Sequence, residues 1–248
     1  MNALFISDLH LSEERPHITA AFFAFLDQKT QGVDHLYILG DFFDAWIGDD
    51  DDRPLAETVA NALQCVAAHG VQIFFQHGNR DFLLGEHYAA RCAMQLLPAL
   101  HVIETNGQRV LLAHGDQFCT QDAAYQQFRA LVRNPAWQQD FLAKSLVERR
   151  AIAAQLRAKS KEANSLKAED IMDVTPQEIE TVLLQQQCSV LIHGHTHRPA
   201  RHALALSNGV EAERIVLGDW TDQYCYLQWK NGAAELLWER APSADADV

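Results

Sequence analysis

The chain has 248 residues, and its 33 acidic against 20 basic side chains give a formal net charge of −13 at pH 7 with the 12 histidines neutral. With 48% hydrophobic and 21% charged residues, the composition is that of a globular protein. It excludes a disordered chain, a collagen, a coiled coil and a membrane bundle. Because binding to nucleic acid phosphates requires clustered Lys and Arg, the acidic balance argues against a nucleic acid partner.

The cysteines and the N-terminal residues indicate in which cellular compartment the protein is expected. The five cysteines are widely spaced and form no CxxC pair, as is typical of a reducing cytosol. The first ten residues hold no basic stretch, and Asp8 interrupts their apolar run, so they do not resemble an export signal. No stretch approaches the roughly 18 apolar residues of a membrane span. We therefore expect a cytoplasmic protein that touches the inner membrane only peripherally.

From the N-terminus, short apolar runs rich in strand-forming residues alternate with patterns of helical spacing. Strands are predicted at residues 3–7, 36–39 and 71–76, with helices over 18–28 and 55–68 between them. Further strands are predicted at residues 110–113, 190–193, 215–217 and 224–229. This alternation predicts an α/β fold.

Residues 121–170 interrupt the alternation, because Gln and Ala dominate there and no strand candidate appears. We predict a helical insertion at about 121–170 within a single domain spanning 1–240, and a disordered tail at 241–248. From Lys144 to Lys167, seven bases against two acids give a net charge of +5. This segment is either a solvated helix face or, with Arg149 and Arg150, a surface for an anionic headgroup or lipid layer.

Five short motifs each follow a predicted strand: DLH at 8–10, GDFFD at 40–44, GNRD at 78–81, HGD at 114–116 and GHTH at 194–197. In an open α/β sheet, ligands bind at the carboxyl ends of the strands, so the five motifs can meet. Their charged and imidazole side chains are costly to bury there without a partner. The candidate ligands are Asp8, His10, Asp41, Asn79, His114, His195 and His197.

The types of candidate ligand limit which metal ions can bind and which reaction they can support. Carboxylate, imidazole and amide oxygen without thiolate favour Mn²⁺, Fe²⁺, Co²⁺ or Zn²⁺. Seven ligands are too many for one ion that keeps positions open for water and substrate. Two ions, roughly 3.5–4 Å apart and sharing one carboxylate, account for the number of ligands. Such a pair predicts hydrolysis of a phosphate ester or anhydride.

These ordered motifs resemble those of the calcineurin-like metallophosphoesterases, a family with a two-sheet αββα sandwich and a dinuclear metal centre. Longer segments between residues 5 and 200 resemble the members that act on UDP-2,3-diacylglucosamine in lipid A biosynthesis, among them YILGDFFDAWIGDDD, HGNRDFLLG, SKEANSLK and IHGHTHRPA. The resemblance covers nearly all of the chain except the C-terminal tail. It implies an α/β sandwich of this kind with the helical insertion as a lid.

The resemblance also implies roles for individual residues. One ion would be held by Asp8, His10, Asp41 and His197 and the other by Asp41, Asn79, His114 and His195, with Asp41 bridging two ions that we expect to be Mn²⁺. The resemblance implies substrate contacts for Asp122, Ser160, Asn164 and Lys167, and we expect Asn79, Arg80 and His195 to have both catalytic and substrate contacts. Residues 160, 164 and 167 share one face of a helix, because they recur at i, i+4 and i+7.

Arg80 departs from a common pattern of the family, which has a histidine after the GN pair to protonate the leaving group. Arginine cannot act as a general acid near neutral pH, but its planar fork suits a phosphate oxygen. This favours a diphosphate substrate, whose leaving group departs without protonation. The alternative is that Arg80 forms a surface salt bridge with Asp81.

The expected reaction is hydrolysis of UDP-2,3-diacylglucosamine by attack of a metal-bound hydroxide on the α-phosphorus, giving UMP and 2,3-diacylglucosamine 1-phosphate. The partners are then a lipid-linked nucleotide sugar and the cytoplasmic face of the inner membrane. Candidates for an acyl groove, which could equally belong to the core, are Trp46, Phe82, Leu83, Phe128, Phe141, Leu142 and Ile152. The alternatives are a pyrophosphatase for soluble nucleotide diphosphates or nucleotide sugars and a scaffold without catalysis.

Overall fold

The first sheet has six strands. The computed structural model describes residues 1–165, 171 and 173–240, and the side chains among these except at 161–165. The strands are β1 (Ala3–Ile6), β2 (His35–Leu39), β3 (Gln72–Gln76), β4 (Met94–Leu97), β10 (Gln223–Lys230) and β11 (Ala233–Arg240), in the order β11-β10-β1-β2-β3-β4. β1 to β4 are parallel, whereas β10 runs antiparallel to both β1 and β11.

The second sheet has five strands in the order β5-β6-β7-β9-β8. They are β5 (His101–Thr105), β6 (Gln108–Leu112), β7 (Val190–His193), β8 (Ala200–Ala205) and β9 (Glu211–Val216). The three central strands β6, β7 and β9 are parallel, and both edge strands are antiparallel to their neighbours. The carboxyl ends of β6 and β7 therefore lie at the same edge of this sheet.

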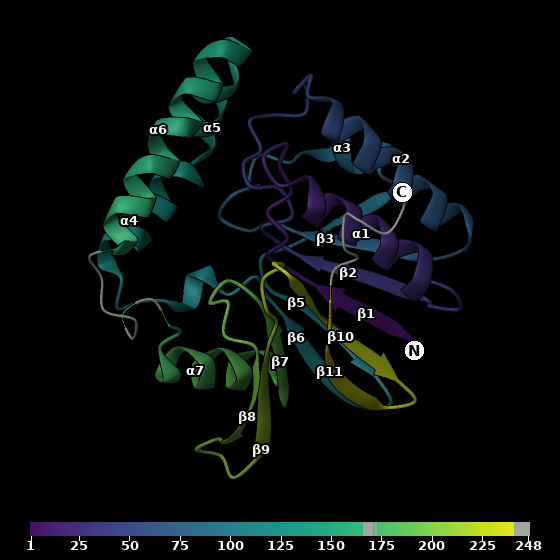
Figure 1. The fold of residues 1–248 in the computed structure, drawn as a ribbon. Coiled ribbons are helices and arrows are strands. Elements are labelled where there is room, and N and C mark those ends of the chain that lie inside the picture. The colour runs from purple at the N-terminus through teal and green to yellow at the C-terminus, as the bar shows by residue number, and fades with distance from the viewer. Residues whose placement is uncertain (166–170, 172, 241–248) are drawn as a thin grey trace.

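Helices cover the outer faces of the two sheets (Figure 1). The first sheet packs against α1 (Pro16–Lys29), α2 (Pro54–Ala68) and α3 (Glu86–Arg91), and the second against α7 (Pro176–Gln186). A separate cluster fills the space between the sheets, where Phe5 and Leu39 of the first sheet meet Val110 and Ile192 of the second. This layering confirms the predicted αββα sandwich.

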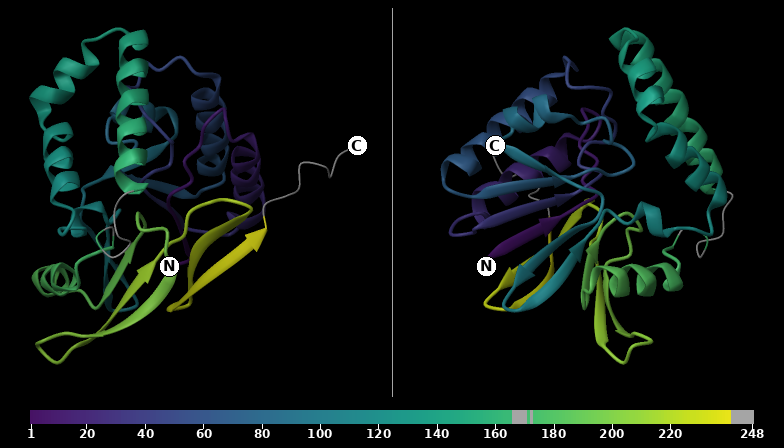
Figure 2. Two further views of the ribbon diagram at one scale, coloured as in Figure 1. Left: turned by 60° about the vertical axis from the view of Figure 1, so that its left-hand side comes forward. Right: turned by 180° about the vertical axis from the view of Figure 1, so that it is seen from behind.

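Three helices between the 3₁₀ turn η1 (Asp116–Phe118) and α7 form the insertion: α4 (Ala123–Val132), α5 (Pro135–Leu142) and α6 (Leu146–Ser165). They stand to one side of both sheets in Figure 1 and in the right view of Figure 2. Phe141 belongs to the cluster under α1 to α3, and Trp137 and Leu146 pack against it, so apolar contacts hold the helices to the sandwich. The predicted tail at 241–248 and the predicted insertion residues 166–170 lie outside the described residues.

The sequence reasoning missed four strands, β4, β5, β8 and β11, and these are the four edge strands of the two sheets. An edge strand has one neighbour and is not buried on both faces, so it lacks the continuous apolar run by which the inner strands were recognised. β8 and β11 alternate between half-buried and exposed positions along their length. None of the helices in the described part of the chain is both long and apolar enough to cross a lipid bilayer.

Candidate metal centre and substrate cavities

The seven candidate ligands lie on loops that directly follow five strands. Asp8 and His10 follow β1, Asp41 follows β2 and Asn79 follows β3, all in the first sheet. His114 follows β6, and His195 and His197 follow β7, in the second sheet. Both sheets therefore contribute to one centre, and the sandwich brings together residues that are nearly 190 positions apart in the chain, as in the contact between His10 and His197.

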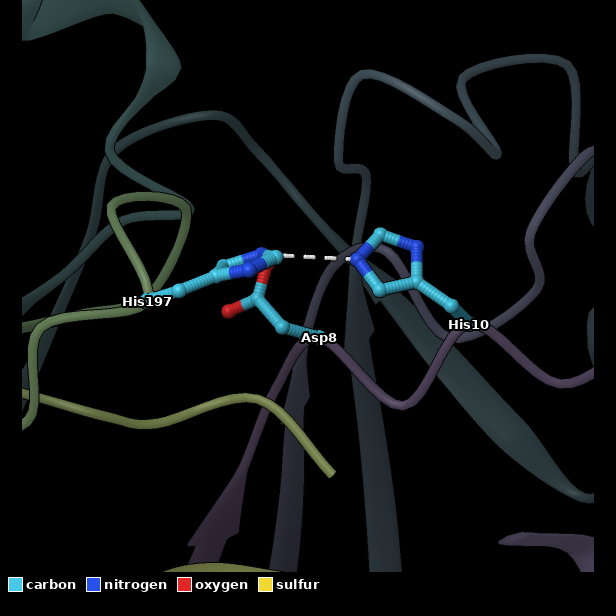
Figure 3. Close-up of side chains that lie close together, drawn as sticks. All are labelled: Asp8, His10 and His197. Carbon is cyan, nitrogen blue, oxygen red and sulfur yellow. Dashed lines mark hydrogen bonds and ion pairs between the residues drawn. The ribbon is translucent and has the colours of Figure 1, made fainter. Parts of the chain in front are cut away.

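The first group of ligands consists of Asp8, His10 and His197, whose ligand atoms lie within 4.8 Å of one another. His197 Nε2 is 3.3 Å from Asp8 Oδ1 and 3.4 Å from His10 Nε2. Figure 3 shows the His10 and His197 rings facing each other, with the Asp8 carboxylate next to the His197 ring. Asp41 Oδ2 is 3.9 Å from His10 Nε2, at the side of the second group.

The second group is formed by Asp8, Asp41 and His114, again within 4.8 Å of one another. Asn79 Oδ1 lies 3.0 Å from His114 Nε2 and 2.9 Å from His195 Nδ1, while Asp41 Oδ1 is 3.7 Å from His114 Nε2. The two oxygens of Asp41 thus face one histidine of each group. This is the arrangement expected of a carboxylate shared by two cations.

His114 is oriented by the strand next to it. Its Nδ1 lies 2.8 Å from the carbonyl oxygen of Leu39, which can only accept, so Nδ1 donates. In neutral His114, Nε2 then carries a lone pair and faces Asn79 Oδ1, a second electron-pair donor. A proton or a metal cation between the two atoms removes their repulsion, and a backbone carbonyl behind a histidine is the usual support for a metal ligand.

The backbone of the centre is strained. Nine described residues other than glycine have positive φ, and five of them are candidate ligands: Asp8, His10, Asp41, His195 and His197. A positive φ costs a residue with a Cβ about 1–2 kcal/mol, so this conformation persists only where the surrounding structure imposes it. Glycines make the close approach possible, since a Cβ at Gly40 would lie 2.5 Å from Gly78 N and a Cβ at Gly194 would collide with the Asp8 carboxylate.

The electrostatics of the centre match cation binding. Burial raises the pKa of Asp41 to about 7, and the nearby Asp81 and Asp8 carboxylates add to the effect, although His114 opposes it. Burial lowers the pKa of His195 to about 4, which keeps its imidazole neutral at pH 7. A buried carboxylate that resists ionisation and neutral imidazoles are the groups that a divalent cation stabilises, so the donor set fits such ions.

Arg80 is not paired with Asp81, and that alternative is wrong. Asp81 is fully buried and accepts hydrogen bonds from the backbone amides of Gly78 and Phe42. Arg80 instead lines the cavity above the ligands, and its Nε is buried with no hydrogen-bond partner among the described residues. The guanidinium is therefore available to an anion at this point.

A polar cavity of about 320 Å³ lies over the centre, and the predicted substrate contacts Asn79, Arg80, Asp122, Ser160 and His195 all line it. Asp122 also accepts from the backbone amide of Tyr125 at the start of α4. The side chain of Asn164 and all of Lys167 lie outside the described residues.

An apolar cavity of about 260 Å³ adjoins the polar one, and the two share Asn79, Arg80, Tyr125 and Ser160. Five of the seven acyl-groove candidates line it: Trp46, Phe82, Leu83, Phe128 and Phe141. Leu142 is instead exposed, and Ile152 packs against the core. Sequence reasoning missed Trp137, Ala153 and Leu156. The spacing of residues 153, 156 and 160 along one face of α6 is a signal that could have found the wall of this cavity.

Comparison with known proteins agrees with this geometry. The calcineurin-like phosphoesterase family model matches residues 1–199. A UDP-2,3-diacylglucosamine hydrolase of Cellvibrio japonicus is 55% identical over 240 residues, covering 96% of this chain and all of the relative. The chain belongs to the UDP-2,3-diacylglucosamine hydrolase family of calcineurin-like phosphoesterases. Relatives with the same name from Serratia proteamaculans and Shigella dysenteriae are 51% and 53% identical, each covering 96% of this chain and 98% of the relative.

In this phosphoesterase, Asp116 of the HGD motif joins the centre to the insertion, a role that the sequence did not reveal. Its buried carboxylate accepts from Tyr125 and Arg129 of α4, each at 2.7 Å. Arg133, after the end of α4, donates to the carbonyl oxygen of Gly78 at 2.8 Å. Helix α4 is therefore fixed to the same loops that carry the candidate ligands.

The basic segment of this phosphoesterase does not form the membrane surface expected at Arg149 and Arg150. Arg149 is only 3% exposed and forms hydrogen bonds to Ile47 and Asp50, while Arg150 pairs with Asp51 and Asp52. Two bases of α6 thus pair with Asp50, Asp51 and Asp52 of the acidic run. The prediction was wrong because it treated two segments about 100 residues apart as independent surfaces.

Proposed function

We propose that the protein hydrolyses the diphosphate of UDP-2,3-diacylglucosamine, as the names of its relatives suggest, to UMP and 2,3-diacylglucosamine 1-phosphate. The observation that carries this proposal is the direct connection of two cavities. The polar cavity above the ligands shares Asn79, Arg80, Tyr125 and Ser160 with the apolar one. A substrate with a diphosphate beside acyl chains fits both, whereas a soluble nucleotide sugar leaves the apolar cavity unused.

Two divalent cations, which we propose to be Mn²⁺, would complete the centre. Asp8, His10, Asp41 and His197 would hold one ion, and Asp41, Asn79, His114 and His195 the other. Bound there, the ions supply positive charge for the diphosphate oxygens and lower the pKa of water. The oxygen and imidazole ligands suit Mn²⁺ among the borderline-to-hard ions.

The neighbouring side chains orient the diphosphate. Arg80 donates to its oxygens with a guanidinium that has no competing partner at Nε among the described residues. Because Arg80 cannot give up a proton, it stabilises negative charge without acting as an acid. Asn79 and His195 border the same cavity and hold the reacting group in place. Attack of water on the α-phosphorus then leaves the sugar phosphate as an anion that needs no proton to depart.

The glucosamine would lie between α4 and α6. Asp122 and Ser160 line the polar cavity from these two sides. We propose that they hydrogen-bond to the sugar, together with Asn164 and Lys167 farther along the chain. The acyl chains would then enter the apolar cavity, where Phe82, Phe128 and Leu156 exclude water.

We further propose that the insertion rests on the cytoplasmic face of the inner membrane. Leu131, Leu142 and Val147 of the insertion are 55%, 41% and 74% exposed. Exposed apolar side chains on the same three helices that line the apolar cavity suit shallow contact with a bilayer. Val147→Glu should weaken sedimentation with anionic liposomes, whereas Val210→Glu, at an exposed valine in the β8–β9 connection, should not. Equal effects of the two variants would contradict the proposed membrane face.

The decisive experiment supplies Mn²⁺ and compares UDP-2,3-diacylglucosamine with UDP-glucose in ¹⁸O-labelled water. We expect turnover of the lipid substrate only, with the label in UMP. Label in the sugar phosphate would refute attack on the α-phosphorus. Equal turnover of both substrates would show that the apolar cavity does not determine substrate specificity.

A further inference from the structure

A third cavity, of about 250 Å³, borders the polar cavity on the side of the second sheet and has no assigned role. We name it the cationic cavity, after the two arginines Arg198 and Arg214 that line it together with Asp173 and His202. It shares Thr196 and Arg198 with the polar cavity and, among the described residues, none with the apolar cavity. The three cavities therefore follow one another in the order apolar, polar, cationic.

The charged residues of the cationic cavity form an ordered array. Arg198 Nη1 lies 3.3 Å from Asp173 Oδ2, and Arg214 Nη1 lies 3.7 Å from Asp173 Oδ1. The array thus presents a donor, an acceptor and a donor in succession. The Arg214 side chain is only 12% exposed, and Val216 beside it is buried, so part of this array is shielded from water.

Thr196 supplies a second, independent observation. Its Oγ1 is buried and has no hydrogen-bond partner in the described part of the chain, and the residue lines both the polar and the cationic cavities. A buried hydroxyl without a partner costs about 1–3 kcal/mol. A polar ligand that passes from one cavity to the other would provide the missing partner.

We propose that the cationic cavity binds the uridine end of the substrate and selects uracil. This inference rests on the proposed function, because a diphosphate in the polar cavity with acyl chains on one side places the nucleoside on the other. The edge of uracil presents an acceptor, a donor and an acceptor at O4, N3–H and O2, the complement of Arg198, Asp173 and Arg214. Cytosine offers a lone pair at N3 and a donor at N4, so it leaves the Asp173 carboxylate facing an acceptor.

The test is calorimetric titration of the Mn²⁺-loaded protein with UMP and CMP, which does not depend on turnover. We expect the wild-type protein to bind UMP at least about tenfold more tightly than CMP. Asp173→Asn should remove most of that preference, because its amide can both donate and accept. Arg198→Ala should weaken UMP binding about tenfold, whereas the matched control Arg201→Ala, on exposed β8 and paired with Glu213, should leave it unchanged.

Equal binding of UMP and CMP by the wild-type protein would overturn the proposal. So would UMP binding by Asp173→Asn and Arg198→Ala at wild-type affinity and base preference, in variants whose melting temperature is unchanged. A separate assay with UDP-2,3-diacylglucosamine distinguishes this failure from that of the proposed function. If the protein prefers UMP to CMP but does not hydrolyse the lipid substrate, the proposed nucleotide site is supported and the proposed lipid substrate is refuted.

Discussion

The loops at the strand ends and the helical insertion contrast in how their charges are stabilised. At the strand ends, Asp8, Asp41 and His114 are buried side by side, on a strained backbone that neighbouring strands hold in place. In the insertion, Arg149, Arg150 and Arg157 each pair with a carboxylate in the connection between β2 and α2. The first arrangement gathers groups that fit a divalent cation, whereas in the second each of these arginines pairs with a carboxylate of the chain. A concentration of charge in the sequence therefore does not by itself mark a functional site, because packing decides whether like or opposite charges meet.

The strongest test of this contrast is Asp41→Asn, which removes the carboxylate between the two ligand groups. We expect kcat/KM to fall at least roughly 100-fold, since loss of a ligand should exceed the effect of losing a supporting group. Metal analysis of the purified variant should show less than the full complement of ions. Activity and metal content at wild-type values would contradict the shared role of Asp41.

A smaller effect is expected in the apolar cavity, where we propose that the acyl chains bind. Leu156→Glu should raise KM for UDP-2,3-diacylglucosamine about tenfold, because a charge replaces apolar area that covers the acyl chains. Ala154→Glu, at an exposed position of the same helix, serves as the matched control. If both variants behave like wild type in steady-state assays, α6 does not contact the acyl chains.

Tyr125→Phe tests the junction between the two regions. The variant loses the hydrogen bond to the buried Asp116 carboxylate, so we expect the free energy of unfolding to fall by about 1–2 kcal/mol. Denaturation with urea provides the measurement. Gln127→Phe, at an exposed neighbouring position, is the control for an exposed aromatic side chain. Equal stability of the Tyr125→Phe variant and the wild-type protein would show that this hydrogen bond does not stabilise the fold.

The smallest effect concerns Asp50→Asn in the charged interface. We expect a loss of less than about 1 kcal/mol at pH 7, since the Asp50 side chain is 64% exposed. The hydrogen bond from Arg149 is the main cause that lowers the Asp50 pKa from 3.8. A lowered pKa in the folded state stabilises the protein above pH 3.8 and ceases to do so as the pH falls through the lowered value. The difference from wild type should therefore vanish in acid, and a constant difference down to pH 2 would refute the ion pair.

Sequence reasoning found the inner strands but none of the edge strands, and the difference has a physical cause. β2 and β7 are buried on both faces, so their residues form short, uninterrupted apolar runs. β8 faces solvent along alternate residues, and its sequence, ARHALA, has no such run. Pairing with β9 makes it a strand, and that partner is set by the fold.

The sequence alone determined which residues form the centre, because each candidate ligand directly follows a strand, and the carboxyl ends of parallel strands meet wherever such sheets form. Only the tertiary structure decided which charges meet. It paired the basic helix α6 with the acidic run, buried Asp81 away from Arg80, and set Arg198, Asp173 and Arg214 in one array. Contacts between segments distant in the chain depend on how the sheets and helices pack. That packing cannot be predicted from the spacing of residues or from net charge.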